Sequence, residues 1–136
     1  MENLIASNQL TEKNKTLATT YINAVGQKKS GLFPELLRDD VEFKGTIMTF
    51  HTAADLIGAF KQLGTVLLRN EIKKVFADEN GACIIYDLIL ADDLNAVPCM
   101  EWIKIKKGKI TSIQLVFDSK LFLSVRGEVM NRLNPK

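Results

Sequence analysis

The fold is decided by the segment VPCMEWIKIKKGKITSIQLVF, which spans residues 97–117. In 97–105 and 113–117 every odd position except Glu101 is apolar, while the even positions mix apolar and polar residues, and Lys106-Lys107-Gly108 separates the halves. Alternation with a period of two is typical of a β-strand with one buried face, and the glycine suits the left-handed position of a three-residue loop. The segment therefore predicts an antiparallel hairpin in which position 101 pairs with position 113.

Two more strand-like segments, 66–77 and 82–91, precede this hairpin. The turn between them contains Asn80-Gly81, which is a strong hairpin signal, and residues 92–95 form the next polar loop. Four long strands joined by tight turns predict an antiparallel meander.

The N-terminal half has the sequence pattern of amphipathic helices. Apolar residues spaced three or four apart predict a helix over 11–28, and Pro34 suits the first turn of a short helix over 32–37. Thr52 and Asp55 resemble a capping box that begins a third helix, which Gly64 ends. Short extended pieces are expected at 41–44 and 47–50. A last helix is expected over 118–133, capped by Asp118 or Ser119.

The chain of 136 residues is long enough for one domain with a substantial core. Helices followed by strands favour an α+β fold over a parallel, doubly wound sheet. We expect residues 1–10 to form a flexible lead-in and residues 11–136 to form the single domain. Helices packed into a strongly curved antiparallel sheet would leave a closed-ended, largely apolar pocket.

Composition excludes several classes of function. The net charge is +2, and the one group of lysines, at 104–109, surrounds the expected hairpin tip without interleaved aromatic residues, so no nucleic-acid site is expected. No apolar run is long enough for a membrane span. Cys83 and Cys99 lie in apolar runs, too far apart for a disulfide, and no secretory signal precedes them, so a reducing, cytoplasmic setting is expected.

Motifs for cofactors and metals are missing from the sequence. There is no phosphate-binding loop, dinucleotide fingerprint or cluster of metal ligands, so neither a cofactor nor a metal is expected. His51 is the only histidine, and we expect it to be a surface or capping residue, or else to lie at the pocket rim.

Four segments carry a resemblance to a known superfamily: YINAV at 21–25, LLRDDVEF at 36–43, MEWIKI at 100–105 and IQLVFD at 113–118. Over residues 11–118 the chain resembles the nuclear transport factor 2-like superfamily, which includes SnoaL-like polyketide cyclases and ketosteroid isomerase. The resemblance implies a cystatin-like, cone-shaped α+β barrel whose helices close a curled sheet over a cavity. It also implies a homodimer formed through the outer face of the sheet.

The parity of the hairpin assigns side chains to the two faces. Glu101 shares the apolar face, so desolvation should raise the pKa of its carboxyl group and suit it to acid/base chemistry. The alternative is that Glu101 faces solvent or pairs with Lys104. Met100 and Trp102 fall on the outer face, where an apolar patch favours a subunit interface. The expected pocket is lined by Leu17, Tyr21, Phe43, Phe60, Cys99, Ile103, Ile113, Leu115 and Phe117.

The resemblance to ketosteroid isomerase also implies roles for individual residues. It places Tyr21 and Glu101 at the tyrosine and the protonated carboxyl group that stabilise an oxyanion. It places Phe43 where that enzyme has its proton-abstracting carboxylate, and Glu42 beside it points the other way. The oxyanion partners would remain without the base, so steroid isomerase activity is not expected. The alternative for Tyr21 is a core tyrosine whose hydroxyl group bonds a neighbour.

Asp87 is the third candidate catalytic residue, and the two turns that flank its strand predict different pairing partners for it. A loop of residues 92–95 would pair it with Glu101, and two adjacent carboxyl groups could relay a proton. The Asn80-Gly81 turn instead pairs it with Lys73 or Lys74, in an ion pair on the outer face. Both faces of its strand are apolar, so parity leaves the question open.

The expected function is the binding of a small apolar, carbonyl-bearing molecule, with cofactor-independent acid/base chemistry of an isomerase, cyclase or lyase type by Glu101, Tyr21 and Asp87. Two alternatives remain at this point. The cavity could hold a ligand without reaction, or it could be vestigial in a dimeric scaffold.

Overall fold

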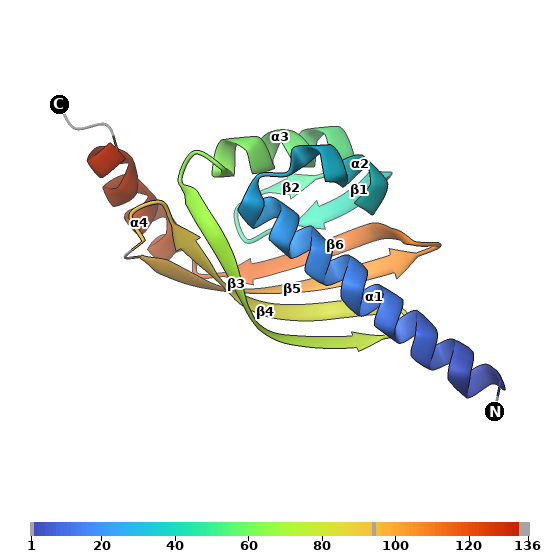
Figure 1. The fold of residues 1–136 in the computed structure, drawn as a ribbon. Helices are drawn as coiled ribbons and strands as arrows, with labels where there is room; N and C mark the ends of the chain where they lie inside the picture. The colour runs from blue at the N-terminus through green and yellow to red at the C-terminus, as the bar shows by residue number, and fades with distance from the viewer. Residues whose placement is uncertain (1, 94, 134–136) are drawn as a thin grey trace.

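The computed structural model describes residues 2–93 and 95–133. Figure 1 shows a sheet that curves around the N-terminal helices, and a last helix at one end of it. The helices are α1 (Glu2–Gln27), the 3-10 turn η1 (Ser30–Leu32), α2 (Phe33–Leu36), α3 (Ala53–Leu63) and α4 (Ser119–Leu133). The strands are β1 (Leu37–Lys44), β2 (Thr49–Phe50), β3 (Leu67–Asp78), β4 (Gly81–Leu90), β5 (Ala96–Lys106) and β6 (Lys109–Phe117).

The six strands form one sheet in the order β2-β1-β6-β5-β4-β3. The antiparallel meander from β3 to β6 is as predicted, and so is the α+β class. The expectation of a wholly antiparallel sheet is wrong in one place, because β1 lies parallel to β6. The outermost strands are β2, which has two residues, and β3, whose pairing is irregular between Ile72 and Lys74.

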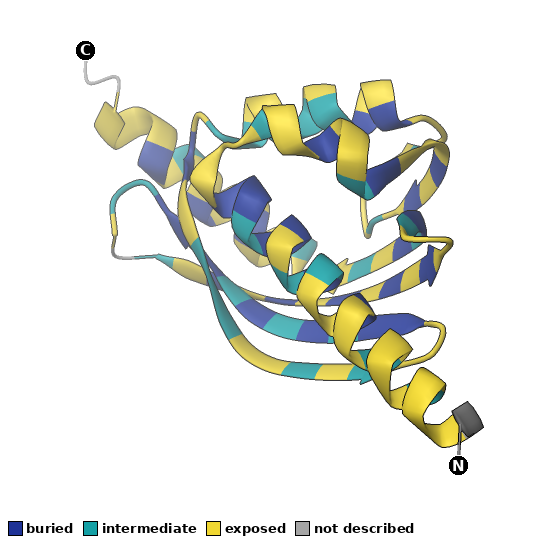
Figure 2. Cartoon of the chain, turned by 45° about the vertical axis from the view of Figure 1, so that its right-hand side comes forward, coloured by how far each residue is buried: buried dark blue, intermediate teal, exposed yellow. Residues whose placement is uncertain are grey.

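Helices cover the concave face of the sheet. Helix α1 packs on β3 and β4, and α2 and α3 pack near β1 (Figure 1). Strand β5 alternates buried and exposed residues along its whole length, as a strand with one covered face does. Figure 2 shows the buried residues on the helix surfaces and strand faces that point toward each other. The core therefore fills the space between α1, α3 and the sheet.

Helix α1 begins at Glu2, so the expected lead-in over residues 1–10 is corrected, except for Met1, which lies outside the described residues. The segment contains no glycine or proline and is rich in good helix formers, so nothing ends the helix there. The first turns extend past the sheet in Figure 1. The helix becomes anchored at Asn14, whose buried Nδ2 donates a hydrogen bond to the Asp78 carbonyl oxygen at 3.0 Å.

Both predicted helix caps are present. The backbone N–H of Asp55 donates to Thr52 Oγ1 at 3.2 Å, at the start of α3. The backbone N–H of Leu121 donates to Asp118 Oδ1 at 3.0 Å, at the start of α4. Each side chain satisfies a backbone donor that the first turn of a helix leaves unpaired.

Helix α4 packs on its own chain, at one end of the sheet. Phe122, Val125 and Val129 are buried, and the ring of Phe122 meets that of Phe117 at 5.5 Å between centroids. Arg132 forms an ion pair with Asp92 at 2.7 Å, which ties the helix to the loop between β4 and β5. Within the described residues, no helix carries an apolar stretch that could cross a membrane.

Candidate functional site around Glu101

The β5–β6 hairpin sets the direction of the Glu101 side chain. Lys107 and Gly108 form a two-residue turn with φ values of 53° and 74°, so the expected three-residue loop is corrected. A bulge next to Ile105 then shifts the register, and Glu101 pairs with Leu115 instead of the expected residue 113. The two registers differ by two residues, and an even difference leaves the side chain on the same face. Glu101 therefore points into the core.

The Glu101 carboxyl group lies between two phenols. Tyr21, from α1, donates a hydrogen bond to Oε1 at 2.9 Å, and Tyr86, from β4, donates to Oε2. All three side chains are buried, with Glu101 only 3% exposed. The alternative partner, Lys104, lies on the other face, where its Nζ is 4.6 Å from the centroid of the Trp102 ring. The core thus holds a carboxyl group with both oxygens bonded to tyrosine hydroxyls.

Burial controls the electrostatics of this trio. Desolvation raises the pKa of Glu101 from 4.5 to about 7, although the hydrogen bonds from Tyr86 and Tyr21 pull it down. Desolvation, and then the nearby Glu101 charge, hold the pKa values of Tyr21 and Tyr86 well above their ordinary range. The same two causes raise the pKa of Cys99 to about 12. Glu101 is therefore the one member that can change its protonation state near neutral pH.

Tyr86 is the member of the trio that sequence reasoning missed, and the cause is the loop after β4. Strand β4 pairs with β5 so that Ile84 lies opposite Glu101 and Tyr86 lies opposite Cys99. The expected register, with residue 87 opposite residue 101, is wrong by an odd number, which exchanges the two faces of β4. Tyr86 consequently points inward.

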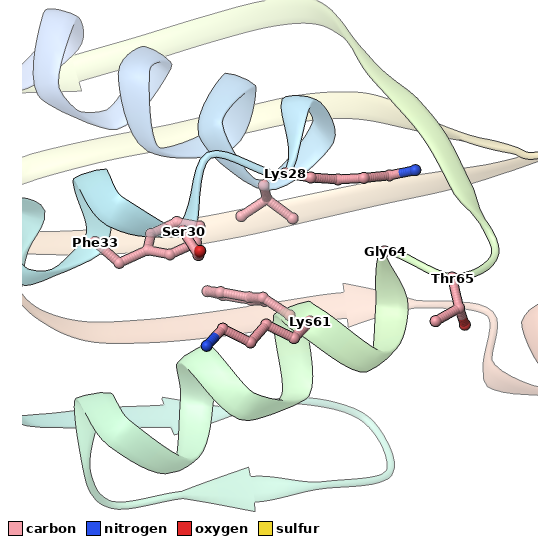
Figure 3. A pocket seen from close by; sticks show the side chains of 8 residues that line it. Lys28, Ser30, Phe33, Lys61, Gly64 and Thr65 are labelled. Carbon is pink, nitrogen blue, oxygen red and sulfur yellow. The ribbon is translucent and has the colours of Figure 1, made fainter.

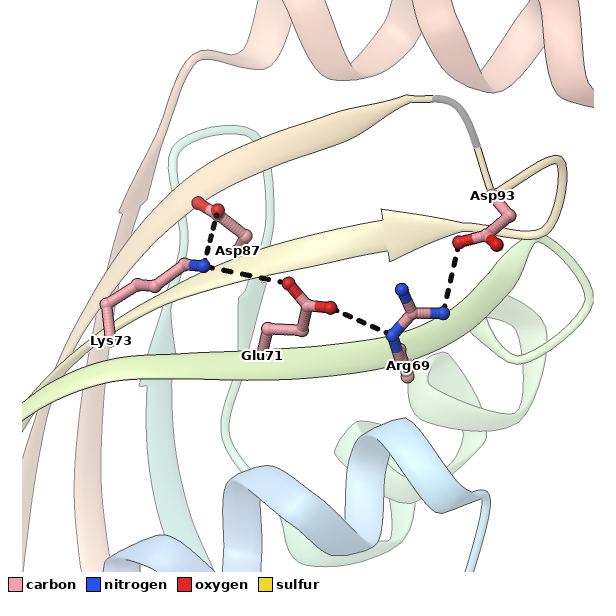
Figure 4. Close-up of polar contacts among 5 residues, drawn as sticks. All are labelled: Arg69, Glu71, Lys73, Asp87 and Asp93. Atoms are coloured by element: carbon pink, nitrogen blue, oxygen red, sulfur yellow. Dashed lines mark hydrogen bonds and ion pairs between the residues drawn. The ribbon is translucent and has the colours of Figure 1, made fainter.

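Asp87 points to the outer face, away from Glu101. Its carboxylate lies 3.6 Å from Lys73 Nζ, which confirms the outer-face ion pair that was the alternative. Figure 4 shows this contact within a chain of charges that continues through Glu71 and Arg69 to Asp93. The irregularity of β3 next to Ile72 brings Lys73 to this face. A proton relay between Asp87 and Glu101 is thus excluded by the register.

The other residues expected to line a cavity are distributed through the core. Tyr21, Ile103 and Ile113 are at most 1% exposed, and Phe43 and Cys99 are nearly as buried. Leu17, Phe60, Leu115 and Phe117 are partly buried and pack against this core. Phe43 contacts the rings of Phe50 and Phe60, and no described acidic residue other than Glu101 is buried in the core.

Glu42 and His51 lie together at the surface. The Glu42 carboxylate is 2.7 Å from His51 Nδ1, and both side chains are exposed. His51 is therefore a surface residue, which is one of the expected positions. Glu42 points away from Phe43's side of the strand, as expected from the alternation of β1.

A groove of about 280 Å³ opens between the end of α1, η1 and the end of α3. Figure 3 shows Lys28, Ser30 and Phe33 on one wall and Lys61, Gly64 and Thr65 on the other. Of the residues expected to line a pocket, Phe60 lines this groove. Its ring packs on Phe33 at 5.1 Å and on Tyr21 at 5.9 Å between centroids, so the floor of the groove lies against the Tyr21–Glu101–Tyr86 trio. The full lining comprises Val25, Lys28, Ser30, Phe33, Phe60, Lys61, Gly64 and Thr65.

The outer face of the sheet carries an exposed apolar cluster beside its charged residues. Met100 and Trp102 are exposed there, as expected, together with Phe76 and Val116. Strand pairing places Phe76 beside Cys83 and Cys83 beside Trp102, while Met100 lies beside Val116. Both cysteines are free. Across the described part of the chain, no three His, Cys, Asp or Glu side chains gather in a way that could hold a metal ion.

Comparison with known proteins finds likeness in structure and none in sequence families. No family model matches the chain, and no curated protein sequence matches it. An NTF2-like protein of unknown function from Cytophaga hutchinsonii superposes with a TM-score of 0.68 at 18% identity, covering 79% of this chain and 91% of that one. A candidate ketosteroid isomerase from Kribbella flavida gives 0.71 at 18% identity, covering 80% of each chain.

A third structure covers more of the chain. An LEH-like epoxide hydrolase from M. tuberculosis superposes with a TM-score of 0.72 at 14% identity, over 93% of this chain and 98% of that one. Identities this low compare architecture and leave chemistry open. The order of elements, the curled sheet and these superpositions agree with the predicted resemblance: this chain has the nuclear transport factor 2-like fold.

Proposed function

We propose that this protein binds a small, largely apolar molecule bearing a carbonyl group between its helices and sheet, and that Glu101 exchanges a proton with that group. The observation that carries the proposal is the buried Glu101 carboxyl group held between the hydroxyls of Tyr21 and Tyr86. A buried carboxyl group is unfavourable in its charged form, and groups with shifted pKa values cluster at functional sites.

The pKa of about 7 supports the role of Glu101. A proton donor or acceptor is most effective when its pKa lies near the working pH, because both of its forms are then populated. In its protonated form Glu101 can donate to a carbonyl oxygen. The phenols of Tyr21 and Tyr86, whose protons bond Glu101 in this structure, would turn to the same oxygen when the ligand binds. Three donors around one developing negative charge form an oxyanion site.

Proton abstraction from carbon is not part of the proposal. That step needs a second base, and the position that resemblance assigns to it holds Phe43, which is buried against Phe50 and Phe60. The site is thus suited to binding and polarising a carbonyl group. The rings of Phe33 and Phe60 lie between the groove and Tyr21, since they line the groove and both contact Tyr21.

The test has two parts. First, carbon-13 NMR of the labelled Glu101 carboxyl group should titrate with a midpoint near 7. A midpoint near 4.5, the ordinary value, would remove the acid/base role. Second, 2-acetylnaphthalene labelled at the carbonyl carbon should bind with a downfield shift of that carbon that follows the Glu101 titration.

Variants make the second part specific. Tyr21→Phe removes one donor and should reduce the downfield shift, while Tyr86→Phe should do the same from the other side. An exposed control, Glu128→Gln on α4, should change neither measurement. A carbonyl resonance that responds neither to the two tyrosine substitutions nor to pH would contradict the proposal.

We also propose that the chain forms a homodimer through the outer face of its sheet. The exposed cluster of Phe76, Met100, Trp102 and Val116 supports this, since apolar patches of this kind are common at interfaces. Sedimentation velocity should show a dimer for the wild type and a monomer for Trp102→Lys. The matched control, Leu123→Lys, replaces an exposed apolar residue on α4 and should remain dimeric. A monomeric wild type would refute this part.

A further inference from the structure

The groove between α1, η1 and α3 combines an apolar floor with two positive charges. Phe33, Phe60 and Val25 supply apolar surface, while Lys28 and Lys61 come from opposite walls (Figure 3). Neither lysine forms an ion pair with any residue that the structure describes, and no acidic residue lines the groove. The groove therefore has uncompensated positive charge, which favours the binding of an anion.

Lys28 occupies an unusual backbone position. Helix α1 ends in a Schellman arrangement, in which the N–H of Lys29 bonds the Ala24 carbonyl oxygen at 3.0 Å and that of Lys28 bonds the Val25 carbonyl oxygen at 3.3 Å. Lys28 has the left-handed φ of 61° that such a cap requires. Glycine normally fills this position, because a side chain there is strained. Lys28 thus adopts a backbone conformation that is unfavourable for a residue with a side chain, and that side chain lines the groove.

From these two observations we infer that the groove binds an amphipathic organic anion, namely a small aromatic or aliphatic body with a terminal carboxylate. The body lies against Phe33 and Phe60, where flat apolar surface is available. Figure 3 shows the two ammonium groups pointing toward opposite ends of the groove, so the carboxylate takes a charge-assisted hydrogen bond from Lys28 at one end or from Lys61 at the other. Ser30 adds a hydroxyl donor on the same wall as Lys28 (Figure 3). A volume near 280 Å³ lies at the small end of ligand pockets, which favours a compact body of one or two rings.

The site stands apart from the proposed function. It requires no proton exchange at Glu101, and it uses charged residues that the Glu101 trio does not contain. Its floor contacts Tyr21, so the two sites are neighbours. The Glu101 titration tests the proposed function separately, and either idea can fail without the other.

The experiment compares two probes of the same shape, 2-naphthoate and its neutral analogue 2-naphthalenemethanol, by NMR titration of labelled protein. We expect naphthoate to bind more tightly than the alcohol and to shift resonances of Phe33 and Phe60. The double variant Lys28→Gln/Lys61→Gln should weaken naphthoate binding about fivefold, as expected for the loss of one partly exposed charge contact at either end of the groove, and leave the alcohol unchanged. Lys106→Gln, at the distant hairpin tip, is the matched control and should bind both probes as the wild type does.

A second variant ensures that a loss of binding is not a loss of folding. Lys28→Gly places glycine at the left-handed position, so its melting temperature should equal or exceed that of the wild type while naphthoate binding weakens. Equal affinity for the two probes would overturn the inference, as would unchanged naphthoate binding in the double variant. Shifts confined to Phe76 and Trp102 on the outer face would also overturn it.

Discussion

The replacement Glu101→Gln should change how stability depends on pH. The folded state raises the pKa of Glu101 from 4.5 to about 7, so between these values the folded protein holds a proton that the unfolded chain releases. Stability must then fall as pH rises through this window. Below 4.5 the carboxyl group is protonated in both states, and above 7 the folded protein carries the full penalty of a buried charge.

The size of the effect follows from the same two values. A difference of about 2.5 pH units, at about 1.4 kcal/mol for each unit, gives a loss of roughly 3 kcal/mol on going from acid to mildly alkaline pH. Glutamine has nearly the same shape and does not titrate, so the variant lacks this loss. The variant should therefore gain about 3 kcal/mol relative to the wild type between pH 4.5 and pH 8.

Urea denaturation of both proteins across this pH range measures the difference. Every other group, including His51, is common to both chains, so subtraction of the two curves isolates Glu101. Glu128→Gln, an exposed substitution on α4, is the control and should give a curve parallel to the wild type. Parallel curves for Glu101→Gln as well would show that the carboxyl group titrates normally, and the reasoning about its burial would be refuted.

Three further outcomes test the surroundings of this group. Tyr86→Phe removes a donor that lowers the pKa of Glu101, so an NMR titration should move above the wild-type midpoint; an unchanged midpoint would contradict the hydrogen bond. Asp87→Asn should leave that midpoint unmoved and alter stability by less than about 1 kcal/mol, because its ion pair is on the outer face; a shifted midpoint would return Asp87 to the core. Gly81→Ala would place a Cβ 1.9 Å from the Ile103 carbonyl oxygen at a φ of 152°, so urea denaturation should show a loss above about 2 kcal/mol, and a wild-type midpoint would refute the close approach.

Local sequence features were enough to predict the helices and strands and to predict which residues of β5 point into the core. The inward face of β5 follows from the odd positions 97–105, which are apolar except for Glu101, and the cap at Thr52 requires only a residue three positions further on. The predicted β5–β6 register was wrong by two residues, but the predicted direction of the side chains was still correct, because an even shift preserves the face. The position of Glu101 could therefore be predicted even though its pairing partner could not.

The position of Tyr86 could not be predicted, because it depends on the length of a loop. Asp92 accepts a hydrogen bond from the Asn95 backbone, and Asp93 takes a left-handed φ of 56°. The loop begins before its polar residues, and Ile89 lies opposite Ala96. Residues 84–89 are apolar on both faces, and alternation gives no hint of the register. The one available signal was Tyr86 itself, because a tyrosine within a buried strand needs a partner for its hydroxyl group.

The N-terminal part of α1 escaped prediction for a different reason. Its first turns make an exposed hydrogen bond from Ser7 to Glu79, which imposes no apolar stripe, and Leu4 and Ile5 are exposed. Helix propensity alone supports this part, whereas periodicity identifies only the part that packs on the sheet.

The two outermost strands have a consequence for aggregation. An open strand edge can recruit further chains into fibres, and proteins avoid this with short, irregular or charged edges. Here β2 offers only two residues, and β3 carries a bulge together with Arg69, Glu71 and Lys73. Edge-to-edge growth is disfavoured at both ends of the sheet. This leaves the exposed apolar cluster on the outer face, where the proposed dimer would close on itself instead of propagating.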